Sequence, residues 1–191
     1  GDKVQINNVN ILGRQNTFFV TNSGVDNTLR SDRQTRTLVT NSYLEGDVDI
    51  VSGRGAVVFD NTDFRVVNSR TQQAGYVFAP STLSNLYYGF LAVNSRFTAA
   101  GNGVAQLGRS LDIDSSTNGQ AVIRDSVINE GFNVAKPWGD AAVSGRAYAG
   151  NTGTADDKGN IQRDLNDAKF NRFWEFNNRG LGSKVVAEPK K

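Results

Sequence analysis

A short pattern of apolar and polar positions recurs through the first two thirds of the chain. It consists of an apolar residue, any residue, Asn or Asp, two further residues and a second apolar residue. The polar residue of each copy is Asn8, Asn41, Asn61, Asn94 or Asp125, so successive copies are 33, 20, 33 and 31 positions apart. Short strands that recur at polar turns with a period of about 20 to 35 residues predict a solenoid of β coils.

The repeated asparagines favour a parallel β-helix, because Asn side chains stacked at equivalent turns form hydrogen-bonded ladders. The unequal steps indicate that some coils carry long outward loops, where such folds hold their functional sites. An antiparallel β-sandwich is the structural alternative. It is disfavoured because no two-residue hairpin turns join the expected strands. With 191 residues, the chain is long enough for one sizeable domain, which we expect to be all-β and to span 1–191.

The pattern changes in the last third of the chain. Small and polar residues at 134–159 predict loops packed on the solenoid. Within them Asp156-Asp157-Lys158 predicts a solvated turn, because the alternating ligand spacing of a calcium loop is missing. From 160 to 178 apolar residues recur at steps of mostly three and four, which predicts a short amphipathic helical segment that closes the solenoid. Its apolar positions are Ile161, Leu165, Ala168, Phe170, Phe173 and Trp174. The polar tail at 187–191 is expected to fray.

The stretch 43–53 has glycines at Gly46 and Gly53, and two carboxylates lie between them. Its alternation predicts one strand in which Val48 and Ile50 share a face, while Asp47, Asp49 and Val51 share the other. If the Val48 face is buried, Asp49 stands on the outside of the sheet, where a carboxylate can meet a ligand. By composition alone, a solvated surface aspartate would explain the same pattern.

The composition removes several kinds of chemistry. The chain has no Cys and no His, which excludes disulfides, thiolate nucleophiles, Ser-His-Asp triads and Cys or His metal sites. Acid–base work near neutral pH must therefore fall to Asp and Glu. The net charge is +2, and the basic residues are scattered without a stripe, which argues against a nucleic-acid partner. No apolar run approaches the roughly 20 residues of a membrane-spanning helix.

Three segments resemble the signature segments of the pectin methylesterases, a family of carbohydrate esterases, in their order and separation. They lie at 13–19, 46–53 and 107–112, and match the family's Gln-Asp-Thr, Gly-x-Val-Asp-Phe-Ile-Phe-Gly and Leu-Gly-Arg-Pro-Trp segments. The segment at 76–82 is similar to one that follows the nucleophile in the family. The resemblance extends from about Gly13 to Gly182 and implies a right-handed parallel β-helix, here its C-terminal part.

The resemblance also implies roles for individual residues. Asp49 stands at the family's nucleophile, which attacks the methyl-ester carbonyl of a galacturonate unit and forms an acyl-enzyme. Arg109 stands at the arginine that keeps the nucleophile ionised and oriented. Gln15 stands at a glutamine that donates a hydrogen bond to the tetrahedral oxyanion. We place Tyr76, in the segment that follows the nucleophile, among the substrate-binding residues. No cofactor and no metal is implied.

The positions that depart from the family pattern also bear on function. The family's general acid/base aspartate is Asn16 here, and an amide can neither give a proton to the leaving group nor take one from water. Losing such a group costs a rate factor of ~10²–10⁴. The substrate-stacking tryptophan is Leu111, which remains a substrate-binding position without the sugar platform. The family phenylalanine that follows the nucleophile is Ile50 here, and the one before the closing glycine is Ser52. A second oxyanion glutamine of the family has no counterpart at 1–12.

Two functions of different class follow. The first is a carboxylic-ester hydrolase that demethylates methyl-esterified polygalacturonate or is retuned towards thioesters or activated esters, because Asn16 cannot protonate methoxide. In this reading Asp47 could assist water attack on the acyl-enzyme. The alternative is a catalytically silent carbohydrate-binding or structural envelope protein. A pectate-lyase-like β-helix is disfavoured, because no cluster of carboxylates for calcium surrounds Asp49.

The expected surroundings also come from the resemblance. The first residues are not a signal peptide and already resemble the inside of a β domain. We therefore expect the N-terminal half of the same protein to be a partner, since an opened coil would expose unpaired backbone and apolar core. The expected ligand is a pectin-like polysaccharide or another ester substrate. Nucleic acid is not expected as a partner. Export is implied, to the bacterial envelope or the exterior, with outer-membrane association through an N-terminal segment as one arrangement.

Overall fold

The computed structural model describes residues 1–21, 34–67, 75–84, 86, 88–101, 103–113, 117–144 and 171–183. Within them the regular structure is entirely β and forms three sheets. The six-stranded sheet has the order β1 (Val4–Asn7), β4 (Arg36–Thr40), β7 (Ala56–Asp60), β10 (Phe90–Val93), β13 (Gln120–Arg124) and β15 (Arg172–Phe176). The five-stranded sheet contains β2 (Asn10–Leu12), β5 (Tyr43–Gly46), β8 (Asp63–Val66), β11 (Arg96–Ala99) and β14 (Val127–Ile128). The four-stranded sheet contains β3 (Phe18–Val20), β6 (Val51–Gly53), β9 (Tyr76–Pro80) and β12 (Gln106–Gly108).

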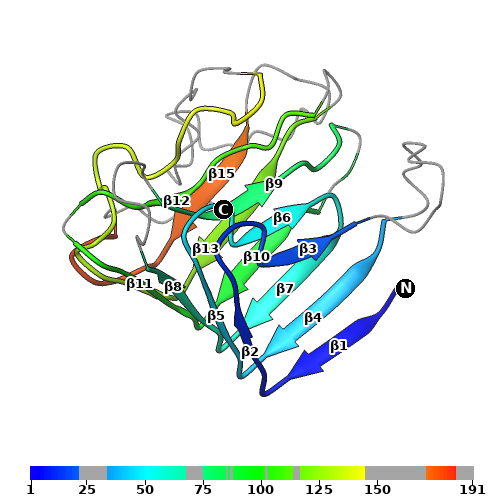
Figure 1. Cartoon of the computed structure of the whole chain (residues 1–191), viewed down its shortest axis with the longest axis horizontal. Coiled ribbons are helices and arrows are strands. Elements are labelled where there is room, and N and C mark those ends of the chain that lie inside the picture. Colours follow the sequence, from blue (N-terminus) through cyan, green and yellow to red (C-terminus); the bar gives the residue numbers. More distant parts are fainter. Residues whose placement is uncertain are drawn as a thin grey trace.

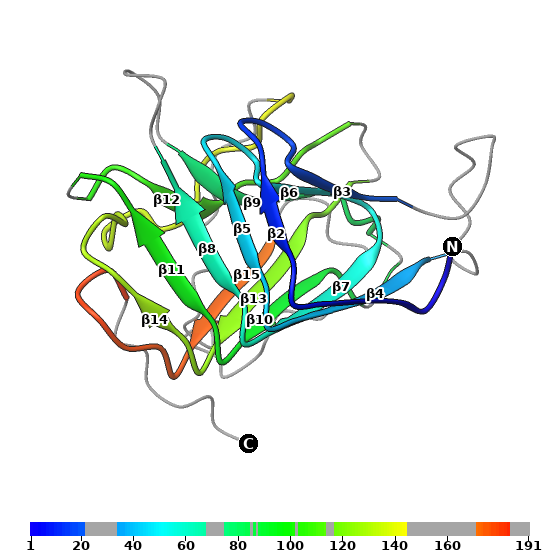
Figure 2. The ribbon, with the colours of Figure 1, turned by 60° about the horizontal axis from the view of Figure 1, so that its bottom comes forward.

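The strands pair in parallel, and each joins the equivalent strand of the next coil. In the six-stranded sheet β4 pairs β7, and β7 pairs β10, while the chain visits the other two sheets in between. Figures 1 and 2 show the result, a stack of coils whose strands rise in chain order through each sheet. The predicted parallel β-helix is confirmed, and the antiparallel sandwich is excluded.

The repeated polar residue marks the corner between the six-stranded and the five-stranded sheet. All five predicted positions have a left-handed backbone, with φ of 57° at Asn8, 51° at Asn41, 50° at Asn61, 50° at Asn94 and 51° at Asp125. Asn and Asp tolerate this conformation better than other residues with a side chain, which explains the repeat. The ladder is also present in part, since Nδ2 of Asn61 donates to Oδ1 of Asn41 at 2.8 Å.

The sequence prediction for the C-terminal part of the chain is wrong where the structure describes it. Arg172–Phe176 is a strand that pairs β13 in parallel, not part of a helix. Asn177 then repeats the corner with a φ of 50°, and its Nδ2 donates to Oδ1 of Asp125 at 2.6 Å. Phe173 is buried and stacks on Trp138 with ring centroids 4.7 Å apart, so this strand adds another rung to the core. The rest of the predicted helical segment and Asp156-Asp157-Lys158 lie outside the described residues.

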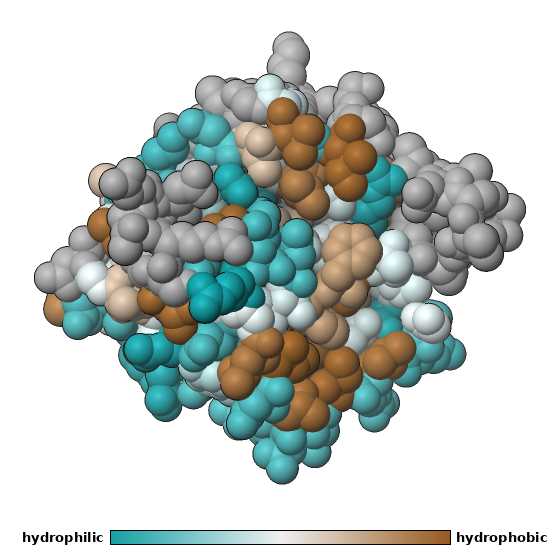
Figure 3. Space-filling view, in the orientation of Figure 1, coloured by the Kyte–Doolittle hydropathy of each residue, from teal (hydrophilic) through white to brown (hydrophobic). Residues whose placement is uncertain are grey.

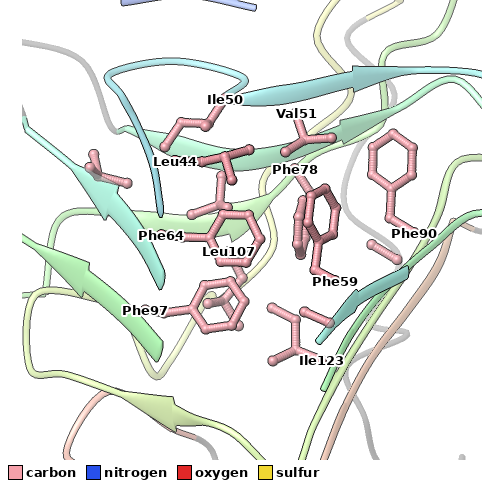
Figure 4. Close-up of a cluster of buried hydrophobic side chains, with 14 of the residues drawn as sticks. Leu44, Ile50, Val51, Phe59, Phe64, Phe78, Phe90, Phe97, Leu107 and Ile123 are labelled. Atoms are coloured by element: carbon pink, nitrogen blue, oxygen red, sulfur yellow. The ribbon is translucent and has the colours of Figure 1, made fainter. Parts of the chain in front are cut away.

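One continuous core fills the space between the three sheets. Phenylalanines of neighbouring coils meet edge to face or stacked, as Phe59 does with Phe64 at 5.0 Å and Phe64 with Phe97 at 4.8 Å between ring centroids. Phe78 of the four-stranded sheet contacts all three of these rings. Figure 4 shows these side chains converging from different sheets. This packing fixes the coils to one another and therefore fixes the corners that carry the candidate site.

Arg172 is a buried cation that the sequence did not single out. Only 1% exposed, it donates to the backbone carbonyls of Leu86 at 2.7 Å, Asn118 at 2.9 Å and Leu83 at 3.1 Å. Burial lowers the pKa of Arg172 to about 10, so the side chain stays protonated at neutral pH.

We expect Arg172→Met to lower the free energy of unfolding by about 3–5 kcal/mol, because it removes three hydrogen bonds from a buried cation to backbone carbonyls. Chemical denaturation of the full-length protein measures the change. The matched control is Arg124→Met, since the side chain of Arg124 is 47% exposed, and its loss should cost below about 1 kcal/mol. Equal effects of the two substitutions would contradict a bridging role for Arg172.

Candidate active site

The carboxylate singled out in the sequence lies on a corner between two sheets. The stretch predicted as one strand is two, since β5 ends at Gly46 and β6 begins at Val51. Asp49 lies between them with a φ of 53°, a left-handed conformation that interrupts the alternation of a strand. As a result Ile50 and Val51 both pack in the core, although the predicted strand had placed them on opposite faces (Figure 4).

Asp49 and Arg109 form a bidentate pair across two coils. Nε of Arg109 donates to Oδ1 of Asp49 at 2.9 Å, and Nη2 donates to Oδ2 at 2.8 Å. The side chain of Asp49 is 5% exposed and that of Arg109 22% exposed, so the pair is largely shielded from water. The prediction that Asp49 stands on the outside of the sheet is therefore wrong, as is the alternative of a solvated surface aspartate, because the carboxylate is buried and bound by the guanidinium. Each carboxylate oxygen uses one lone pair in this contact and keeps another for chemistry.

Arg109 remains a full cation in this setting. Burial lowers the pKa of Arg109, but the hydrogen bonds and the negative charge of Asp49 outweigh burial, and the net pKa is raised. On its other side the guanidinium carbon lies 4.2 Å from the ring centroid of Tyr76. A charge-assisted fork of this kind fixes the rotamer of the carboxylate.

Gln15 and Asn16 occupy the equivalent corner one coil earlier. Gln15 bridges Val48 in parallel, and the backbone N–H of Asn16 donates to the carbonyl of Val48 at 3.2 Å. Asn16 has a φ of 50°, so its corner repeats the backbone of the Asp49 corner. Adjacent parallel strands are about 4.8 Å apart, which brings Asn16 beside Asp49 in the stack. Both Gln15 and Asn16 are exposed and thus open to a substrate.

The remaining predicted residues lie around this pair in different ways. Leu111 is half-buried, and its backbone N–H donates to the carbonyl of Pro80 at 3.0 Å. Asp47 is only 2% exposed, and the break between the two strands removes the shared face on which its proposed role beside Asp49 depended. Tyr76 is half-buried, with its ring against Arg109 as described above.

Other candidate sites on the described residues are apart from this pair. A groove of about 1020 Å³ runs over the six-stranded sheet, but none of the predicted site residues lines it. In the part of the chain that the structure describes, no group of three or more Asp and Glu residues is placed to hold a metal ion. No helix there is long and apolar enough to cross a membrane.

The contacts that hold Tyr76 beside Arg109 could not be predicted from the sequence. Tyr76 pairs Gln106 in the next coil, and Gly139 of the coil after that lies against both side chains. The signal was the coil period, because 76, 106 and 136 to 139 are separated by about one coil each. The period alone does not give the pairing register between neighbouring coils, so it does not predict which side chains are in contact.

No protein-family model matches the chain. Among curated proteins, Escherichia coli YbhC, named "Putative acyl-CoA thioester hydrolase YbhC", is 78% identical over 191 residues, which is all of this chain and 45% of that protein. The crystal structure of E. coli YbhC superposes with a TM-score of 0.86 over 96% of this chain and 46% of that one.

Pectinesterases match over nearly the same range. Pectinesterase B of Dickeya dadantii is 42% identical over 194 residues, covering 95% of this chain and 43% of that protein. The structure of rice weevil pectin methyl esterase superposes with a TM-score of 0.79 at 34% identity, over 95% of this chain and 50% of that one. The chain thus spans about half the length of the curated relatives it matches.

Proposed function

The chain belongs to the pectinesterase family, and we propose that it carries the catalytic centre of a carboxylic-ester hydrolase with Asp49 as nucleophile. The observation that carries this proposal is the shielded bidentate pair of Asp49 and Arg109. An isolated surface carboxylate would be solvated and a weak nucleophile. Here the guanidinium binds both carboxylate oxygens and presents the carboxylate in one orientation.

The reaction has two balanced steps. In the first, an Oδ atom of Asp49 attacks the ester carbonyl, the tetrahedral intermediate collapses, and the alkoxide, phenolate or thiolate leaves with the electron pair of the broken bond. This gives a mixed anhydride between Asp49 and the acyl group. In the second, water adds to the acyl carbonyl and the bond from that carbonyl to Oδ of Asp49 breaks. The acyl group leaves as a carboxylic acid, Asp49 is regenerated as a carboxylate, and the remaining water proton passes to the expelled anion or to solvent. Gln15, exposed one coil away, is the residue that we propose to donate a hydrogen bond to the oxyanion of each intermediate.

The leaving group is restricted by Asn16. An amide cannot protonate methoxide, whereas a thiolate or phenolate leaves without an acid, since thiols have a pKa near 8.5 and phenols one near 10. We therefore propose that thioesters or activated esters are better substrates than methyl esters. The name of E. coli YbhC refers to an acyl-CoA thioester, and the names of the other relatives refer to pectin. The exposed Asn16 at the corner beside Asp49 supports the former class.

Turnover by the full-length protein should be compared on three substrates: methyl-esterified polygalacturonate, a phenyl ester and an acyl thioester. We expect kcat on the thioester or phenyl ester to exceed kcat on the methyl ester by a factor of about 10² or more. Product acid is measured in each case against a protein-free blank. Equal or faster turnover of the methyl ester would contradict the proposed leaving-group preference.

A second candidate is a silent carbohydrate-binding or structural protein, which is favoured by Asn16 and Leu111 in place of the family's acid/base and sugar-stacking residues. On this alternative, a pectin oligosaccharide binds with the same affinity to wild type and to Asp49→Ala, and no ester is turned over. Calorimetric titration of both proteins distinguishes the two functions, because turnover on any of the three esters removes this alternative.

The surroundings of the chain are also part of the proposal. The curated relatives are about twice as long, and the first coil exposes Val4, Leu12 and Phe19. Figure 3 shows hydrophobic side chains gathered at the lower edge of the molecule, over the first strands. We propose that an N-terminal half of the same protein covers them, and that the whole protein lies in the cell envelope, outer membrane or exterior. Cell fractionation that recovers it only with cytosolic markers would contradict that location.

A further inference from the structure

Among the aromatic groups that the structure describes, the ring of Tyr76 is the one in contact with the Arg109 guanidinium. The edge of this guanidinium is engaged by the two oxygens of Asp49, and its face lies on the ring at 4.2 Å from the centroid. A substrate could not stack on that face of the ring while the cation occupies it. The geometry therefore gives Tyr76 a second task, in addition to the substrate-binding position expected from the sequence.

The backbone of Tyr76 also holds the other member of the pair. Its N–H donates to the carbonyl of Asp47 at 3.2 Å, and its carbonyl accepts from the N–H of Ile50 at 3.2 Å. These two bonds bracket Asp49 on its corner, where a left-handed backbone must be maintained. One residue thus fixes the position of the carboxylate through its main chain and the position of the cation through its ring.

The ring of Tyr76 is itself held by the next coil. A Cβ added to Gly139 would lie 2.7 Å from Cε1 of Tyr76 and 2.9 Å from Oε1 of Gln106, so only glycine fits against this edge of the ring. Nε2 of Gln106 donates to the carbonyl of Lys136 at 2.7 Å, and the N–H of Gly139 donates to the carbonyl of Gly108 at 2.8 Å. These contacts connect the ring to the strand that ends just before Arg109.

We propose that Tyr76 is a positioning residue for the reaction: its ring, seated against Gly139, holds the Arg109 guanidinium in the plane that grips Asp49. The inference rests on the proposed esterase function for its kinetic consequences but not for its structural ones. In a shielded site, the attraction between a cation and an aromatic face is strong enough that losing the contact should lower the rate about 30-fold. The guanidinium carbon lies over the ring of Tyr76, so a phenylalanine ring should supply most of this contact.

Kinetics on the phenyl ester test the proposal. Tyr76→Phe should keep kcat within about threefold of wild type, and Tyr76→Leu should lower kcat about 30-fold with KM changed less than about twofold. Gly139→Ala should lower kcat in the same way, because it displaces the ring without removing any polar group. Tyr88→Leu is the matched control, since Tyr88 is 72% exposed and lines the groove over the six-stranded sheet. It should leave both constants unchanged.

A second readout does not depend on turnover. The Nε–H of Arg109 is hydrogen-bonded to Asp49 and should give a slowly exchanging proton resonance in wild type and Tyr76→Phe, and a fast-exchanging one in Tyr76→Leu. If no variant turns over any ester but this pattern is found, the proposed function fails and the positioning role stands. The positioning role is overturned if Tyr76→Leu keeps the slow resonance, if it raises KM with kcat unchanged, or if Tyr76→Phe loses as much kcat as Tyr76→Leu.

Discussion

Asp49→Asn lowers kcat on every ester substrate by about 10⁴-fold or more, because the amide that replaces the carboxylate is not a nucleophile. The substitution keeps the size and shape of the side chain, and its amide oxygen can still accept one hydrogen bond from Arg109. The corner backbone is preserved as well, since Asn tolerates the left-handed conformation of Asp49. The loss of rate is therefore chemical, and initial rates on the phenyl ester measure it.

The control for Asp49→Asn is Asp63→Asn on the outer side of the five-stranded sheet. Asp63 also faces an arginine, Arg96 at 3.7 Å, but its side chain is 46% exposed. The control variant should retain wild-type kcat. If Asp49→Asn, shown to be folded by its thermal unfolding, retained more than about a tenth of the wild-type rate, Asp49 would not be the nucleophile.

Asn16→Asp raises kcat on methyl-esterified polygalacturonate by a factor of about 10²–10⁴. The new carboxyl group lies on the corner beside Asp49, where it can protonate departing methoxide and then take a proton from the water that cleaves the anhydride. The gain on a thioester should be smaller, because a thiolate leaves without an acid. Release of methanol and of free thiol by the variant and wild type measures both effects.

The control for Asn16→Asp is Asn8→Asp. Asn8 is exposed and has a φ of 57°, so it shares the backbone of Asn16 but lies at the corner between the six-stranded and five-stranded sheets. Asn8→Asp should change turnover of neither substrate. An unchanged rate of methanol release by Asn16→Asp would show that a missing acid/base is not what limits the protein.

The fold could be predicted from the sequence because one physical requirement repeats in every coil. Each corner after the six-stranded sheet needs a left-handed residue, and Asn8, Asn41, Asn61, Asn94 and Asp125 supply it. The equivalent corner at Asn177 was missed because the spacing of the apolar residues before it also fits a helix. Pairing with β13, which the sequence does not show, decides in favour of a strand.

Single residues of the candidate site could be predicted from the sequence, but their backbone conformation and their contacts could not. The resemblance identified Asp49 and Arg109, which are 60 positions apart and directly paired in the structure. It could not reveal that Asp49 itself is a left-handed corner residue, because the alternation around it fits an unbroken strand. The contact between Tyr76 and Arg109 depends on the register of three coils, for which the sequence has no local signal.

The central claim, that Asp49 is acylated during ester hydrolysis, is tested most directly by the pre-steady-state reaction with a phenyl ester. Without an acid/base at Asn16, cleavage of the anhydride should be slower than its formation, so phenol appears in a burst. We expect a burst of about one phenol per protein molecule, with the acyl mass added to the peptide that contains Asp49 after acid quench. Linear phenol release without any adduct, or an equal burst from Asp49→Asn, would contradict it.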